Sequence, residues 1–140
     1  MELKTKTNNI KIEIYEEFDV YYIVGYDCKT QEKVGFVNFK LKNGNCWLYN
    51  IQVEENFQGL GYGKALGIYF EKFCSDRRIN FIEGKYYPTN ENAKFFYKNR
   101  NYKIEKEDYE WFVSKFIDKE KLEEDYKNII VESKEIEIEK

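Results

Sequence analysis

Histidine is absent from this 140-residue sequence. Its absence excludes Ser-His-Asp and Cys-His catalytic pairs and any metal site built on imidazole ligands. Cysteine is scarce and odd in number, and Cys28, Cys46 and Cys74 lie far apart, which is typical of reduced thiols rather than a disulfide framework. We therefore expect no metal site, and any general base must be a carboxylate, a phenol, an amine or a water.

Long apolar runs and an excess of positive charge are also missing. No segment approaches the roughly 18 apolar residues of a membrane span, and residues 1–4 lack the apolar run of a secretion signal. The net charge is −3 and no basic cluster stands out, which disfavours nucleic-acid binding. The sequence predicts a cytoplasmic protein that binds neither membranes nor nucleic acids.

Aromatic residues, in contrast, are abundant. They make up 19% of the chain, with 13 tyrosines and 11 phenylalanines. Apolar residues account for 42% and charged residues for 35%, a balance typical of globular rather than disordered proteins. At this length we expect one domain over residues 1–140, with a core in which aromatic rings supply much of the packing.

Hydrophobic periodicity predicts a mixed α/β fold with seven strands and three helices. The expected strands cover residues 10–14, 20–24, 34–41, 46–53, 79–86 or 87, 102–107 and 110–116. Asn43-Gly44 predicts a tight hairpin, so the first four strands should form an antiparallel meander. Helices are expected after Gly61, after Thr89 or Asn90, and from about Lys119.

The order of these elements suggests how the sheet is connected. The first helix should link two parallel strands by a right-handed crossover, followed by a second helix, two further strands and the C-terminal helix. Residues 1–9 are expected to be frayed, and the charged residues 132–140 to form a solvated tail.

Three glycines at alternate positions, Gly59, Gly61 and Gly63, lie between the fourth strand and the first helix. A dinucleotide fingerprint needs G-x-G-x-x-G, and here the third glycine comes one residue early. A nucleoside-triphosphate loop needs Gly at the position of Gln58 and Ser or Thr at the position of Ala65. Amides without a covering Cβ at a helix N-terminus still suit a phosphate. The alternative is a tight turn without a ligand.

Two motifs resemble one known family. Gln58, Gly61 and Gly63 match Gln-x-x-Gly-x-Gly after a strand and before a helix. Asn90 and Ala93, followed by an aromatic pair that ends in Tyr97, match a second motif after the fifth strand. On these residues the chain resembles the GNAT superfamily of acetyl-coenzyme A (acetyl-CoA) dependent N-acetyltransferases over residues 33–117. The resemblance implies one N-acetyltransferase domain with a GNAT-like mixed sheet.

The resemblance also assigns roles to individual residues. Tyr97 would be the general acid that protonates the departing thiolate, because a phenol has a pKa of about 10. Glu83 would be a candidate general base, with Glu54 or a water as alternatives; Lys85 stands where some members carry a carboxylate. The expected cofactor-binding residues are Ile51, Val53, Gln58, Gly59, Gly61, Gly63, Lys64 and Asn90. The first two would line the pantetheine arm in a gap between the fourth and fifth strands.

One departure from the family pattern affects the acceptor site. Most members have two helices between the first and second strands, where this sequence predicts only a short turn near Phe18. The acceptor is expected to be a primary amine of a small molecule or a protein, and no metal is expected. A non-catalytic coenzyme A-binding module and a different acyl donor, such as succinyl-CoA, remain alternatives. The C-terminal helix would fill the space of the missing helices or support a homodimer.

Overall fold

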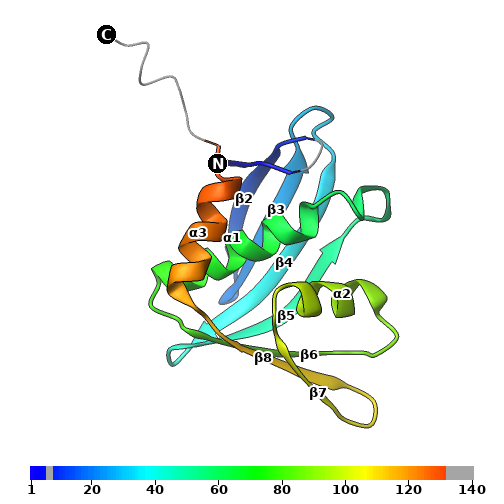
Figure 1. Cartoon of the computed structure of the whole chain (residues 1–140), viewed down its shortest axis with the longest axis vertical. Helices are drawn as coiled ribbons and strands as arrows, with labels where there is room; N and C mark the ends of the chain where they lie inside the picture. Colours follow the sequence, from blue (N-terminus) through cyan, green and yellow to red (C-terminus); the bar gives the residue numbers. More distant parts are fainter. Residues whose placement is uncertain (6–7, 132–140) are drawn as a thin grey trace.

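The computed structural model describes residues 1–5 and 8–131, which form one mixed sheet and three α-helices (Figure 1). The described strands lie in the order β1-β2-β3-β4-β5-β6-β8-β7. The strands are β1 Glu2–Leu3, β2 Ile10–Glu17, β3 Val20–Asp27, β4 Lys33–Lys42, β5 Asn45–Val53, β6 Phe81–Tyr86, β7 Lys103–Lys106 and β8 Trp111–Phe116. The helices are the short 3-10 turn η1 Glu55–Phe57 and the α-helices α1 Tyr62–Asp76, α2 Glu91–Asn99 and α3 Lys119–Ile129.

The N-terminal half is the predicted antiparallel meander. Strands β2, β3, β4 and β5 pair in sequence order. The β2–β3 turn consists of Phe18 and Asp19, with φ of 51° and 66°, so two residues stand where the family usually has two helices. Asn43 and Gly44 also have positive φ, as a tight hairpin requires.

The expectation of a frayed N-terminus was wrong for Leu3. Residues Glu2 and Leu3 form β1, which pairs with β2, and the Leu3 side chain is fully buried. The Lys4 amide also donates to the carbonyl of Ile129 at the end of α3. A two-residue strand has no periodicity to read, so only the contact with a distant helix reveals it. The predicted tail, residues 132–140, lies outside the described residues.

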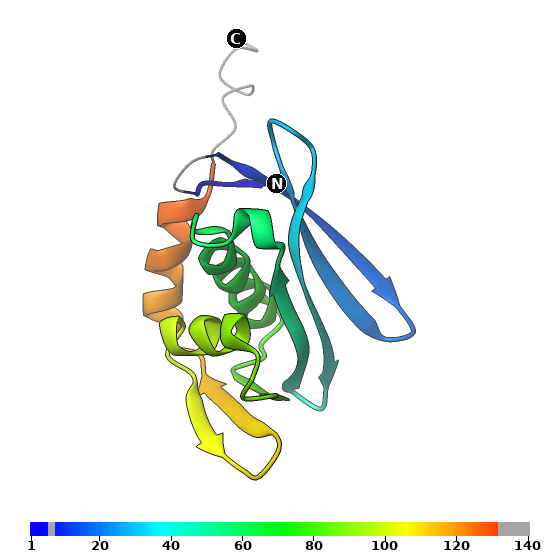
Figure 2. The ribbon, with the colours of Figure 1, turned by 90° about the vertical axis from the view of Figure 1, so that its right-hand side faces the viewer.

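All three α-helices lie on one face of the sheet (Figures 1 and 2). The predicted apolar stripe of α1 is buried from Tyr62 to Phe73, apart from the half-buried Tyr69. Helix α3 buries Leu122 and Ile129 and packs beside α1. No helix of the described chain lies over the other face of the sheet. That α3 fills the space of the missing helices stays a prediction.

Candidate functional site

Strands β5 and β6 run side by side for only part of their lengths. Their parallel pairing ends at Leu48 and Gly84, whereas β5 continues to Val53 and β6 to Tyr86. The register of β4 against β5 shifts after Asn38, which leaves Tyr49 as an extra residue. Such a bulge bends and twists a strand. Tyr49 follows the last paired residue of β5, so the two strands part there, and sequence analysis expected a gap between these strands. We call the stretches of β5 and β6 beyond their last pair, residues 49–53 and 85–86, the splay.

A glycine allows the two strands to meet at the start of the splay. A Cβ added to Gly84 would lie 2.5 Å from the carbonyl oxygen of Leu48, so another residue would push β6 away from β5. Beyond this point, Ile51 and Val53 pair with β4 through one edge of β5. Among the described residues, no strand pairs with their other edge. This edge of β5 is therefore unpaired in the described chain, and the contact of Ile51 and Val53 with a pantetheine arm stays a prediction.

The glycine turn lies at the end of β5 and leads into α1. Gly59 and Gly61 have φ of 79° and 87°, a region that favours glycine. In the part of the chain that the structure describes, no backbone carbonyl accepts a hydrogen bond from the amides of residues 59–64. Nothing lies within 4 Å of a Cβ added to Gly59, so the turn is open on that side. We call residues 59–64 the amide cradle, which presents donors together with the positive end of the α1 dipole.

Gln58 stabilises the turn from within. Its side-chain amide donates to the carbonyl of Val53 at 3.0 Å, and its backbone amide donates to Glu55 at 3.3 Å. Both groups are therefore engaged by the protein, and a contact between Gln58 and a pyrophosphate stays a prediction. Lys64 is exposed at the start of α1, beside the cradle.

A buried pair that sequence reasoning missed anchors the cradle to the sheet. The Tyr62 hydroxyl donates to Oδ1 of Asp27 in β3 at 3.0 Å, and both residues are almost fully buried. The Thr30 amide donates to the other carboxylate oxygen at 2.9 Å. This amide is the main reason that the pKa of Asp27 is lowered despite burial, and Tyr62 adds to the effect. A tyrosine on the helix stripe gave no signal that its partner would be an aspartate in β3.

Helix α2 carries the second motif. The Asn90 side-chain oxygen accepts from the Ala93 amide at 3.1 Å, so Asn90 is the N-cap, one of the two residues after which the sequence predicted this helix. Its expected contact with a cofactor stays a prediction. Ala93, Phe96 and Tyr97 of α2 are buried, and Tyr97 is only 1% exposed.

Tyr97 lies within a cluster of aromatic rings. Its ring centroid is 5.1 Å from that of Tyr86, 5.2 Å from Phe96 and 5.1 Å from Tyr102. Burial raises the pKa of Tyr97 well above its ordinary value, and the neighbouring Tyr86 adds to this. The phenol therefore keeps its proton at neutral pH, and its role as the general acid stays a prediction. Among the described residues, no group accepts a hydrogen bond from its hydroxyl.

Glu83 lies on the opposite face of the sheet from Tyr86. Strand alternation places Glu83 with Lys85 on the face without helices. Glu83 is half-buried and forms no ion pair with the described residues, whereas Lys85 pairs with Glu110 at 2.9 Å. Glu54, the other carboxylate considered, is exposed just after β5. The structure thus does not bring Glu83 and the aromatic cluster together on one face, and a base role for Glu83 requires an amine that approaches from the uncovered face.

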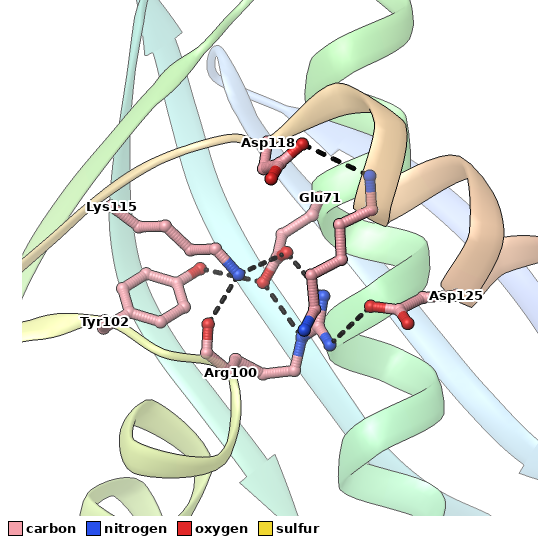
Figure 3. A network of polar contacts seen from close by, with 7 residues as sticks. Glu71, Arg100, Tyr102, Lys115, Asp118 and Asp125 are labelled. Carbon is pink, nitrogen blue, oxygen red and sulfur yellow. Dashed lines mark hydrogen bonds and ion pairs between the residues drawn. The ribbon is translucent and has the colours of Figure 1, made fainter.

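A buried ionic network holds α2 in place (Figure 3). Glu71 of α1 is 1% exposed and accepts from Nη2 of Arg100 at 2.7 Å and from Nζ of Lys115 at 2.9 Å. Arg100, which follows α2, also pairs with Asp125 of α3 at 3.2 Å. The Tyr102 hydroxyl donates to Glu71 as well, at 3.4 Å. Because Arg100 lies one turn after Tyr97, the network fixes the end of the helix that carries this phenol.

The comparisons with known proteins identify the family. The model of the acetyltransferase (GNAT) family matches residues 3–102, so the chain belongs to this family. The family is one of acetyltransferases, which agrees with the predicted enzyme class of an acyl-CoA dependent N-acyltransferase. The comparison with curated proteins found no match.

Solved structures of acetyltransferases share the fold. The PaiA N-acetyltransferase of Thermoplasma acidophilum, in complex with coenzyme A, is 18% identical with a TM-score of 0.64, over 71% of this chain and 62% of that protein. A Bacillus subtilis acetyltransferase in complex with coenzyme A is 14% identical with a TM-score of 0.64, over 77% and 99%. PseH of Campylobacter jejuni, in complex with acetyl-CoA, is 16% identical with a TM-score of 0.58, over 71% and 70%. These likenesses confirm the predicted fold class.

No helix in the described part of the chain has the length and apolar character needed to span a membrane.

Proposed function

We propose that this protein transfers an acetyl group from acetyl-CoA to a primary amine of a small molecule or a protein. The observation that carries the proposal is the position of the amide cradle at the end of the diverging strand β5. A diphosphate suits this donor set, because six amides, the positive end of α1 and Lys64 all favour negative charge. Ile51 and Val53 then offer backbone groups to the arm of the cofactor. When bound, acetyl-CoA supplies the activated thioester.

The transfer needs an unprotonated amine and a proton for the leaving group. The amine nitrogen forms a bond to the thioester carbon, the carbon–sulfur bond breaks, and the thiolate leaves with the electron pair. The Tyr97 phenol donates its proton to that thiolate, and the proton of the amine is lost to Glu83 or to water. Holding the two reactants in place lowers the barrier by up to about 7–11 kcal/mol.

A thiol-release assay tests the proposal. The purified protein is mixed with acetyl-CoA and a panel of small amines and lysine peptides, and free thiol is followed over time. We expect amine-dependent thiol release, and calorimetry should show coenzyme A binding. A protein that neither binds coenzyme A nor acetylates any amine contradicts the proposal. A protein that binds coenzyme A tightly without turnover supports the non-catalytic alternative.

Tyr97→Phe tests the proton donor. We expect kcat to fall by about 10²–10⁴-fold, whereas the affinity for coenzyme A should change little because the ring remains. Tyr109→Phe is the matched control, since Tyr109 is 84% exposed in the β7–β8 hairpin. If both variants retain full kcat, Tyr97 is not the general acid.

A further inference from the structure

The Tyr86 hydroxyl is a buried polar group that has no hydrogen-bond partner among the described residues. Tyr86 is only 7% exposed. Removing a hydroxyl from water without a compensating hydrogen bond is unfavourable, so nearly all buried hydroxyls in proteins are paired. An unpaired hydroxyl at this position needs a physical reason.

Tyr86 is the last residue of β6 and lies beyond the final β5–β6 pair at Gly84. Period-two alternation places it on the same face as Ile82, toward the helices. Its ring lies 5.1 Å from that of Tyr97 and 6.0 Å from that of Trp111. Tyr86 therefore lies on β6 two residues beyond the last β5–β6 pair, with its ring beside that of the proposed proton donor.

Tyr102, a third phenol in this cluster, provides a contrast. The Tyr102 ring also lies 5.1 Å from the Tyr97 ring, but its hydroxyl donates to Glu71. The protein thus pairs the Tyr102 hydroxyl, whereas neither the Tyr86 nor the Tyr97 hydroxyl has a hydrogen-bond partner among the described residues. Burial, together with the charge of Glu91, raises the pKa of Tyr86, so its hydroxyl keeps its proton at neutral pH and is available as a donor.

We propose that the Tyr86 hydroxyl donates a hydrogen bond to an acceptor oxygen of acyl-CoA, a thioester or amide carbonyl, when the arm of the cofactor enters the splay. Such carbonyls are the acceptors that this arm presents at its reactive end. The bond would remove the unpaired donor and hold the acyl group beside Tyr97. This inference rests on the proposed function, because it requires acyl-CoA to bind along β5.

Tyr86→Phe separates this role from a purely structural one. Without ligand, we expect the urea midpoint of the variant to be unchanged or higher, since the substitution removes only an unpaired hydroxyl. With ligand, we expect the affinity for acetyl-CoA, measured by calorimetry, to fall by about two- to twelvefold, the range for one net hydrogen bond. Acetyl-CoA should correspondingly stabilise the variant less than the wild type.

Tyr102→Phe is the matched control. It removes an equally buried hydroxyl that is already paired, so we expect a lower urea midpoint and an unchanged affinity for acetyl-CoA. If wild type and Tyr86→Phe bind acetyl-CoA equally well, the inference is wrong. A lower midpoint of Tyr86→Phe without ligand also overturns it, because the hydroxyl would then be paired within the protein. Absence of acetyl-CoA binding in the wild type overturns the proposed function itself.

Discussion

Gly67 in α1 is a position where helix propensity and packing predict opposite effects. In an exposed helix interior, Gly→Ala stabilises by about 0.8–1 kcal/mol. Here an added Cβ would lie 2.4 Å from Cε1 and 3.0 Å from Cζ of Phe96 in α2. Carbon atoms in contact prefer about 3.5–4.0 Å, so the ring would have to move by roughly 1 Å. Overpacking of this kind costs about 1–3 kcal/mol. We therefore expect Gly67→Ala to destabilise the protein by up to about 2 kcal/mol.

Urea unfolding of four proteins tests this reasoning. Wild type, Gly67→Ala, Phe96→Leu and the double variant form a double-mutant cycle that isolates the contact. In the Phe96→Leu background the clashing ring atoms are gone, so Gly67→Ala should stabilise by about 1 kcal/mol through helix propensity. A higher midpoint for Gly67→Ala in the wild-type background would refute the reasoning, because α1 and α2 would then not be in close contact at this position.

The same substitution links packing to the proposed chemistry. Phe96 precedes Tyr97, so a displaced ring shifts the phenol relative to the splay. A misplacement of about 1 Å can reduce a rate by about 100-fold. We expect Gly67→Ala to lower kcat while the affinity for coenzyme A stays near that of wild type, because the amide cradle is not altered. Equal losses of kcat and of affinity would indicate general unfolding instead.

Three further predictions concern stability. Glu71→Gln leaves Arg100 and Lys115 without their buried carboxylate and should cost about 3–5 kcal/mol in urea unfolding; a loss below about 1 kcal/mol would show that water screens the network. Arg78 has φ of 63° after the end of α1, so Arg78→Gly should raise the unfolding free energy by up to about 1 kcal/mol, and an unchanged midpoint would argue against strain there. The pKa of Asp27 is lowered in the folded state, so its contribution is complete above the unfolded pKa of about 3.9 and is lost as the pH falls through the folded pKa. The advantage of wild type over Asp27→Asn should therefore be constant at pH 5–7 and shrink below about pH 4, and an advantage independent of pH would contradict this.

Local signals in the sequence were sufficient for most elements. Asn43-Gly44 forms the expected hairpin and Asn90 caps α2. Asn101 adopts the left-handed conformation that a residue after a helix often has, and asparagine tolerates it well. Each of these features depends on the conformational preferences of a few neighbouring residues, and those preferences are present in the sequence itself. The two motifs indicated the family for the same reason, since each lies within a short segment.

Contacts between distant segments were not predictable in this way. The sequence did not show that β8 would lie between β6 and β7, that Leu3 would pair beside α3, or that Glu71 would be buried. A carboxylate on a helix is normally exposed, and Glu71 is buried because Arg100 and Lys115 approach it from other elements.

The sequence by itself therefore determined the order of the main elements, the glycine turn and the residues of both motifs. Only the tertiary structure decided that β5 leaves β6 at Tyr49, that the cradle amides remain unpaired, and that Tyr86 is buried without a partner. The physical reason is that an unpaired group is defined by what the rest of the folded chain fails to bring near it. Such a property depends on all the long-range contacts together, and no short stretch of sequence contains it.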